Sequence, residues 1–274
     1  MIKNDWITTS LSNRTPSNLC DFTLTINPYE FIPDTFENNS NRVANELANS
    51  YENIHIFYSG GLDSEYVMKT FIQNDLKFTT VFILTPYNKK DLSYAINFLE
   101  FHNIKPVVYE YDESEMLRIM MMKCVQTGYF SFISGIQLDV CDKISDNNGS
   151  VLLGAGEPFT PPERGLKVSE WTKSIDFCEF EFYVHYHPGN HIGGFYSCDL
   201  ALHYSMLQEA VYTGDIQRTK SNLYGLPYRK KLFWDEKFFM LFNKLKINIE
   251  RYEISAPYDE YLQALVGKNS VTFR

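Results

Sequence analysis

The chain has 274 residues, 44% of them hydrophobic, which is enough to bury the core of one large domain or two modest ones. Its formal net charge of −9 argues against non-specific binding to the nucleic-acid backbone, although a local basic patch stays open. No apolar run reaches the length of a membrane span, and the scattered cysteines include no Cys-x-x-Cys pair, so we expect a cytoplasmic protein without membrane association.

The first 40 residues are rich in Asn, Ser, Thr and Pro and are predicted to form an N-terminal extension. Within it, Phe22–Ile26 alternates apolar and polar side chains, which predicts a short edge strand. Residues 41–50 predict a short helix that leads into an α/β domain over residues 41–165. The composition changes after Pro162, and residues 166–274 are assigned to a separate C-terminal region that binds a second substrate.

The stretch NIHIFYSGGLDSEYVMKTF, which begins at Asn53, predicts a buried strand, a tight turn and a helix. The turn is SGGLDS, from Ser59 to Ser64. Its two adjacent glycines allow positive φ and close approach of a ligand, and the helix that follows directs its first N–H groups and its dipole at the turn. The favoured occupant is an anion such as phosphate. The alternative is an ordinary strand–turn–helix with a Gly-Gly bend.

Apolar runs and helical patterns alternate along the rest of the first 150 residues. The runs predict strands at 79–84, 105–109 and 151–153. The helical patterns predict helices at 91–101, 113–127 and 130–144. This alternation predicts an α/β fold, a parallel β-sheet flanked by helices, with a mostly helical C-terminal region. Ligands of such sheets bind beyond the carboxyl ends of the strands.

A second glycine-rich turn follows the strand at 151–153, with the sequence GAGEP from Gly154 to Pro158. A turn of this kind at the carboxyl end of a strand suits a clamp for pyrophosphate. We expect Glu157 to face the site, and the alternative is a simple turn glutamate.

Beyond Pro162, the segment 177–187 (FCEFEFYVHYH) alternates like a strand, with Glu179, Glu181, Tyr183, His185 and His187 on one side. With His191, Cys178 and Cys198 nearby, a zinc site is one interpretation, and polar residues lining an acceptor pocket are the other. Aromatic-rich helices are predicted at 197–212 and 235–246, and between them the segment LPYRKK, from Leu226 to Lys231, concentrates cations.

The SGGLDS turn resembles the SGGxDS loop of the PP-loop ATP pyrophosphatases, the superfamily that includes asparagine synthetase, GMP synthetase, NAD synthetase and 7-cyano-7-deazaguanine synthase. The order of loop, helix, strand, helix and strand over about sixty residues looks like the start of the synthase domain of asparagine synthetase. The turn at Gly154 is similar to that family's second loop, although Pro158 and Phe159 stand where acidic residues are expected. The cysteine at position 2 of a glutaminase domain is replaced by Ile2.

The resemblance implies Mg²⁺ and ATP as cofactors and assigns roles to individual residues. Backbone N–H groups of Gly60, Gly61 and Leu62, with the hydroxyls of Ser59 and Ser64, would hold the β- and γ-phosphates. Asp63 would bind Mg²⁺, and the backbone of Leu84 would contact adenine. Gly154, Gly156 and Glu157 would border the α-phosphate and the acceptor. Lys230, with Arg229 and Lys231 beside it, would balance the charge of the leaving pyrophosphate, and the alternative for these cations is a solvated surface cluster.

The function implied is an AMP-forming, asparagine synthetase-like ligase that acts on a small molecule or nucleobase, with ammonia that is free or comes from a separate glutaminase. Two alternatives stay open. One is a PP-loop enzyme that modifies tRNA, which the acidic charge and the scattered cysteines count against. The other is a partner subunit that binds a nucleotide without catalysis. The acceptor, the nitrogen or sulfur donor and the oligomeric state are left undetermined.

Overall fold

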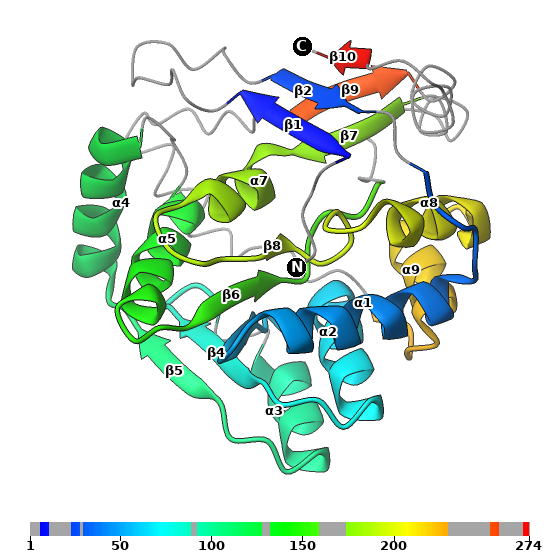
Figure 1. Cartoon of the computed structure of the whole chain (residues 1–274). Helices are drawn as coiled ribbons and strands as arrows, with labels where there is room; N and C mark the ends of the chain where they lie inside the picture. The colour runs from blue at the N-terminus through cyan, green and yellow to red at the C-terminus, as the bar shows by residue number, and fades with distance from the viewer. Residues whose placement is uncertain are drawn as a thin grey trace.

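A parallel sheet organises the protein, whose computed structural model describes residues 6–10, 23–27, 30–88, 92–127, 132–158, 174–229, 253–257 and 271–273. Every neighbouring pair of its strands is parallel. In spatial order the strands are β5 (Val107–Glu110), β4 (Thr79–Leu84), β3 (Ile54–Phe57), β6 (Ser150–Leu153) and β8 (Gly193–Gly194). The α/β fold expected from the alternating pattern is therefore confirmed (Figure 1).

Helices cover both faces of this sheet because strand residues alternate between two apolar clusters. Ile56 of β3 belongs to the first cluster, whereas its neighbour Phe57 belongs to the second. The helices that pack on the first face are α1 (Phe36–Ser50), α2 (Leu62–Gln73), α3 (Leu92–Phe101), α8 (Leu200–Glu209) and α9 (Ile216–Tyr224). Those that pack on the second are α4 (Glu113–Thr127), α5 (Phe132–Ser145) and α7 (Glu179–Tyr186).

Two small antiparallel sheets complete the described structure. Strand β2 (Thr23–Ile26) confirms the strand predicted at this position, but it lies between β1 (Ile7–Ser10) and β10 (Val271–Phe273), so its predicted place at the edge of a sheet is wrong. The reason is that alternation alone does not show how many neighbours a strand has, and the second partner, β10, comes from the far end of the sequence. The second sheet pairs β7 (Ser174–Cys178) with β9 (Glu253–Pro257).

The strand predicted over residues 177–187 is also wrong beyond its first two residues, because the chain turns into helix α7 at Glu179. Phe182 and Val184 are buried, and so is Glu181 between Phe180 and Phe182, so α7 is enclosed on several sides. A helix enclosed in this way lacks a single apolar stripe, and its burial then imitates the two-residue period of a strand.

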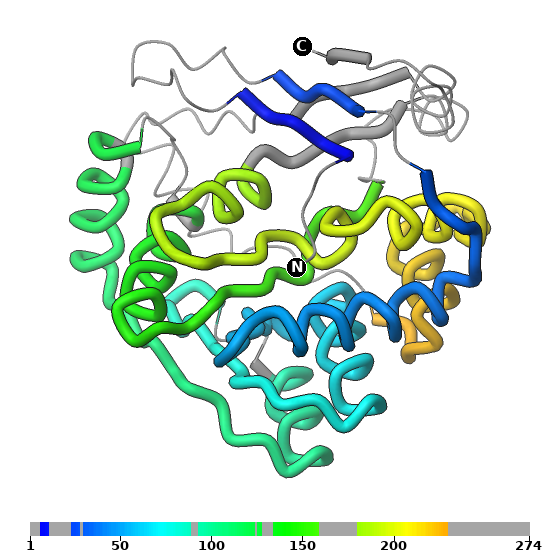
Figure 2. The backbone as a smooth tube through the Cα atoms, in the orientation of Figure 1, coloured from blue at the N-terminus to red at the C-terminus, as the bar shows by residue number. Residues whose placement is uncertain are grey.

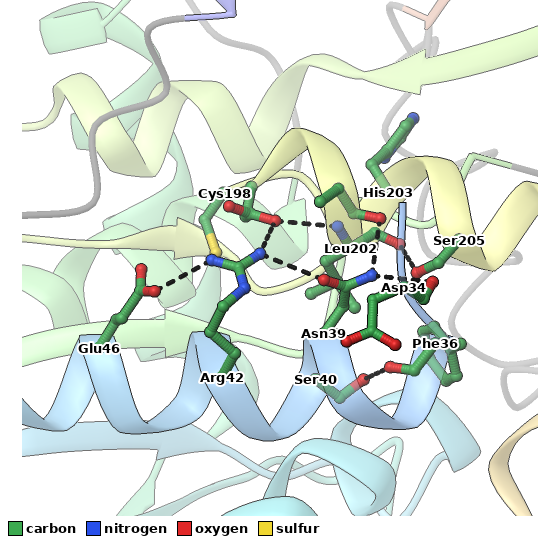
Figure 3. A network of polar contacts seen from close by, with 12 residues as sticks. Asp34, Phe36, Asn39, Ser40, Arg42, Glu46, Cys198, Leu202, His203 and Ser205 are labelled. Carbon is green, nitrogen blue, oxygen red and sulfur yellow. Dashed lines mark hydrogen bonds and ion pairs between the residues drawn. The ribbon is translucent and has the colours of Figure 1, made fainter. Parts of the chain in front are cut away.

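Helix α1 begins at Phe36, five residues before the predicted start, because Thr35 caps it by accepting a hydrogen bond from the N–H of Asn38. The polar residues that hid this first turn are used in packing: the amide of Asn39 donates to the carbonyl of Ala201, 3.3 Å away. Arg42 bridges Glu46 and Asp199, the N-cap of α8 (Figure 3). These contacts fix α8 against α1, and Figure 2 shows α9 lying beside α2 on the same side of the sheet.

None of the helices in the described part of the chain is long and apolar enough to cross a membrane. The helix predicted at 235–246 lies outside the described residues. The boundaries of the three predicted regions stay predictions, although β8, from the C-terminal region, completes the central sheet by pairing with β6.

Candidate functional site

The SGGLDS turn connects β3 to α2 as predicted, at the carboxyl end of the central strand of the sheet. Gly60 has φ of 79°, a conformation that requires glycine in practice, and Gly61 is the N-cap of α2. Ser59 Oγ accepts a hydrogen bond from the N–H of Gly61 and lies 3.3 Å from Ser64 Oγ. Because the first N–H groups of a helix have no acceptor inside it, this turn is a suitable site for an anion.

The second glycine-rich turn lies directly against the first. A Cβ placed on Gly154 would be 2.4 Å from the Cα of Ser64, so glycine is required here for the end of β6 to approach the start of α2. The chain then continues through Gly156 to Glu157, whose carboxylate reaches the region of Asp63. The two predicted loops are thus side by side, which the parallel pairing of β3 with β6 explains.

A lysine that the sequence reasoning missed joins the two loops. Lys220 Nζ lies 2.8 Å from Asp63 Oδ2 and 2.5 Å from Glu157 Oε1, and only 4% of the residue is exposed. We call Asp63, Glu157 and Lys220 the ion cluster. With two carboxylates and one ammonium, the ion cluster carries a formal charge of −1 when all three groups are ionised.

Burial and the neighbouring charges both shift the pKa values of the ion cluster. Burial by itself lowers the pKa of Lys220, but the carboxylates of Asp63 and Glu157 outweigh it and hold the pKa above its ordinary value of 10.5. Burial raises the pKa of Glu157, the charge of Asp63 raises it further, and Lys220 opposes both. Lys220 is therefore a fixed cation at neutral pH, and it allows the two carboxylates to stay close together.

Two tyrosines form hydrogen bonds with Asp63. The hydroxyl of Tyr224 donates to Asp63 Oδ1 at 2.7 Å, and the hydroxyl of Tyr196 donates to the carbonyl of Asp63 at 2.9 Å. Their rings stack on each other and on Tyr66 and Phe36, with centroids 4.7–6.4 Å apart. This aromatic stack fixes the orientation of Asp63, because neither hydroxyl can move without disturbing a packed ring.

Of the three predicted cations near the C-terminal region, Arg229 is described, whereas Lys230 and Lys231 lie outside the described residues. Arg229 forms a two-point ion pair with Glu65 at 2.5 and 2.6 Å and donates to the carbonyl of Gly60 at 3.1 Å. Glu65 is 1% exposed, so Arg229 neutralises a buried carboxylate in the first turn of α2. Arg229 thus contacts the SGGLDS turn through the backbone carbonyl of Gly60.

A capping signal was present in the sequence for the helix that carries Lys220. Asp215 caps the start of α9 by accepting from the N–H groups of Gln217 and Arg218, and Gly225, with φ of 57°, ends it. Asp and Gly ten residues apart predict a short helix, on which Lys220 and Tyr224 share a face. Their meeting with Asp63 depends on packing between α9 and α2, which no local pattern shows.

A cavity of about 320 Å³ opens beside the turn, on the face of the sheet that α4 and α5 cover. The carboxyl ends of β3, β4 and β6 form its floor, as expected for a ligand site in a parallel sheet. None of the described residues that line it carries a charge. These lining residues are Phe57, Tyr58, Ser59, Ser64, Val81, Ile83, Thr85, Asn88, Met116, Ile136, Gln137, Leu153, Gly154, Ala155 and Phe180.

Leu84 does not line this cavity with its side chain, which packs instead against the apolar cluster on the opposite face of the sheet. The carbonyl of Leu84 accepts a hydrogen bond from the N–H of Tyr111 at 2.9 Å. The residues of β4 and its end that line the cavity are Val81, Ile83 and Thr85, because alternate residues of a strand share a face. A backbone contact of Leu84 with adenine stays a prediction.

The residues at the turn fit the groups that the resemblance implies. The anion site at the start of α2 borders a cavity with apolar walls, as a nucleotide with a charged tail and a flat base requires. Asp63 accepts one hydrogen bond on each carboxylate oxygen, from Tyr224 and Lys220, so each oxygen keeps a lone pair for a hard cation such as Mg²⁺.

Of the histidines suggested for zinc, His187 and His191 lie close together, with ring centroids 5.6 Å apart, and each of the three histidines has a contact of its own. His185 Nδ1 lies 3.3 Å from the carbonyl of Ile192, and His187 Nε2 lies 3.3 Å from Asp142 Oδ1, beside the ion pair of Asp142 with Lys123. His191 Nδ1 accepts from the N–H of Val151. Among the described residues, no three His, Cys, Asp or Glu side chains are grouped as metal ligands. The side chain of Cys178 lies outside the described residues, and Cys198 is buried.

Glu181, predicted on a polar strand face, is instead 2% exposed in α7 and lies close to the second loop. Burial raises the pKa of its carboxyl well above the ordinary value, and the charge of Glu157 raises it further. Its Oε2 has no hydrogen-bond partner among the described residues. Burial and the nearby charge of Glu157 therefore both favour the protonated form of the Glu181 carboxyl.

No protein-family model and no curated protein matches this sequence. Among solved structures, an NH3-dependent NAD synthetase from Campylobacter jejuni has a TM-score of 0.33 and 17% identity over 44% of this chain and 56% of its own. An NMN synthetase from Francisella tularensis has a TM-score of 0.35 and 13% identity, over 80% of this chain and 98% of its own. A glutamine-dependent NAD+ synthetase from Acinetobacter baumannii has a TM-score of 0.35 and 12% identity, over 45% of this chain and 27% of its own. The chain thus spans only 56% and 27% of the two NAD synthetases, and similarities this low support no conclusion about its activity.

Proposed function

We propose that this protein is an ATP pyrophosphatase-type ligase, which adenylates an oxygen of an acceptor and then replaces AMP with ammonia or another nucleophile. The observation that carries the proposal is the SGGLDS turn at the start of α2, with an uncharged cavity on one side and the ion cluster on the other. The asparagine synthetase-like form of the reaction, with a carboxyl acceptor, is the finer part of the proposal.

In the first step, an acceptor oxygen bonds to the α-phosphorus of ATP and the bond from that phosphorus to the pyrophosphate oxygen breaks. In the second step, the nitrogen of ammonia bonds to the acceptor carbon, the carbon–oxygen bond to AMP breaks, and a proton leaves the nitrogen. Such a reaction needs positioning and neutralisation of charge more than it needs a side-chain nucleophile.

The roles of the residues follow from their positions. The N–H groups at the start of α2, with Ser59 and Ser64, bind phosphate oxygens, and Lys220 supplies positive charge from the buried side of the site. Glu157 is placed to accept the proton that the nucleophile loses. Mg²⁺ at Asp63 would neutralise phosphate charge when bound. Lys230 and Lys231 remain proposed contacts of the leaving pyrophosphate, and the cytoplasm remains the proposed location.

The experiment is product analysis with ATP labelled at the α-phosphate, in Mg²⁺, with ammonium and a panel of carboxylates and nucleobases. We expect label in AMP or an adenylate and release of pyrophosphate. Asp63→Asn should abolish turnover. Asp75→Asn, a matched change at an exposed aspartate just after α2, should leave it intact. ADP as the main labelled product would overturn the proposed mechanism.

A second candidate, a nucleotide-binding partner subunit without catalysis, is favoured by one observation. Both carboxylate oxygens of Asp63 already accept hydrogen bonds, from Lys220 and Tyr224, so the protein itself occupies part of the capacity that Asp63 would offer to Mg²⁺. ATP that binds tightly but gives no labelled product with any acceptor would favour this candidate. The acceptor, and a separate ammonia-supplying glutaminase, would then belong to the partner.

A further inference from the structure

Most of the polar side chains that line the cavity are already hydrogen-bonded within the protein. The amide of Asn88 accepts from the N–H and the hydroxyl of Thr85 and donates to the carbonyl of Ile83. Ser59 and Ser64 bond within the turn, and the hydroxyl of Tyr58 donates to Glu65 on the other side. These groups hold the walls in place and leave little capacity for a ligand that sits deep in the cavity.

Gln137 is the exception. Its side chain lines the cavity from α5 and is partly exposed, and its amide makes no hydrogen bond with any residue that the structure describes. An amide presents one acceptor and two donors in one plane. Gln137 is therefore the lining side chain, within the described part of the chain, with both a donor and an acceptor available for a ligand.

A planar amide among apolar walls is complementary to one kind of ligand edge. It pairs in two places with an aromatic heterocycle that carries an amino group next to a ring nitrogen, because the amide oxygen accepts from the amino group and the amide N–H donates to the nitrogen. The walls contribute apolar contact from Phe57, Ile83 and Phe180, and the rest of the described lining is uncharged. The 6-amino edge of adenine has this pattern of donor and acceptor.

We infer that Gln137 is a specificity-determining residue, which reads the 6-amino edge of the purine base in the cavity. The inference rests on the proposed function, since it takes the cavity beside the turn as the place of the base. It adds a side-chain contact from α5 to the backbone contact expected at the end of β4. The phosphate-binding turn holds any nucleoside triphosphate, and Gln137 then distinguishes adenine from bases that lack the amino group.

The test compares two ligands in wild type and variants by calorimetric titration: ATP, and purine riboside 5′-triphosphate, which lacks only the 6-amino group. Wild type should bind ATP about five- to tenfold more tightly, the ratio typical of one hydrogen bond. In Gln137→Leu the two ligands should bind with nearly equal affinity. Gln126→Leu, a matched change at an exposed position of α4, should keep the wild-type ratio.

A second variant separates the two halves of the contact. Gln137→Glu keeps an acceptor for the 6-amino group but removes the donor to the ring nitrogen, so ATP should bind more weakly while removal of the 6-amino group still costs affinity. If Gln137→Leu kept the wild-type ratio of affinities for ATP and purine riboside 5′-triphosphate, the inference would be overturned and the proposed function would stand. Wild type that binds neither triphosphate would overturn the proposed function itself.

Discussion

The cavity and the ion cluster lie on either side of one helix start and are built from opposite chemistry. The described lining of the cavity is uncharged, whereas the ion cluster brings three ionisable side chains together out of contact with most of the solvent. Consecutive residues divide the two: Ser64 lines the cavity, and Asp63 holds Lys220. Because neighbouring residues on a helix point about 100° apart, the first turn of α2 can direct Ser64 to the cavity and Asp63 to the ion cluster.

The largest expected effect comes from removing the cation of the ion cluster. Lys220→Met removes the cation that pairs with the half-buried carboxylates of Asp63 and Glu157, so the free energy of unfolding should fall by about 3–5 kcal/mol, measured by urea denaturation at pH 7. Lys77→Met, at an exposed position, is the control. Adding Asp63→Asn and Glu157→Gln to the Met variant should restore part of the loss. An unchanged denaturation midpoint for Lys220→Met would contradict the buried ion cluster.

The next largest effect is expected from a change at the contact between the two glycine-rich turns. Gly154→Ala introduces a Cβ 2.4 Å from the Cα of Ser64, and backbone rather than a flexible side chain must then move. We expect a loss of about 1–3 kcal/mol in unfolding free energy, together with weaker ATP binding because the turn is displaced. Gly214→Ala, where a Cβ meets nothing within 4 Å, should cost only backbone strain and leave ATP binding unchanged. Equal ATP binding in both variants would show that the loops are independent.

Glu181 tests how the protein limits charge beside the ion cluster. The pKa of its carboxyl is raised above the ordinary 4.5, so the folded protein binds this proton more tightly than the unfolded chain does. Its contribution to stability is therefore full below pH 4.5 and is lost as the pH rises through the folded pKa, by up to about 1.4 kcal/mol per pH unit. Glu181→Gln should reduce that slope in denaturation curves taken across this range, leaving the part that the raised pKa of Glu157 contributes, whereas exposed Glu52→Gln should keep it in full. An undiminished slope in the Glu181→Gln variant would place its origin elsewhere.

The smallest effect on stability is expected in the cavity. Ala155→Leu adds apolar volume to space that is open, so the unfolding free energy should change by less than about 1 kcal/mol. ATP binding, by contrast, should weaken tenfold or more, because the added side chain takes the place of the base. Calorimetric titration beside urea denaturation measures both quantities on one preparation. A variant that binds ATP as wild type does would show that the base binds outside the cavity.

Local patterns predicted the framework well. Strand β4 and helix α4 have the bounds read from the sequence, and β3, α2 and β6 follow closely, because apolar runs and turn residues are local signals. The turn at Ser59 and the glycine turn at Gly154 were found for the same reason. Helix α7 was mistaken for a strand because its burial comes from neighbours on several sides, which the sequence does not show.

The sequence by itself determined an α/β sheet with a phosphate-type turn at the carboxyl end of its central strand, since spacing and glycine conformation are properties of a short segment. It also placed Asp63 and Glu157 at the two turns. Only the tertiary structure decided that Lys220, 157 residues after Asp63, joins them, and that Gln137 faces the cavity. The physical reason is that a buried ion pair or a cavity wall depends on which helices pack against the sheet, and packing brings together residues that no local pattern relates.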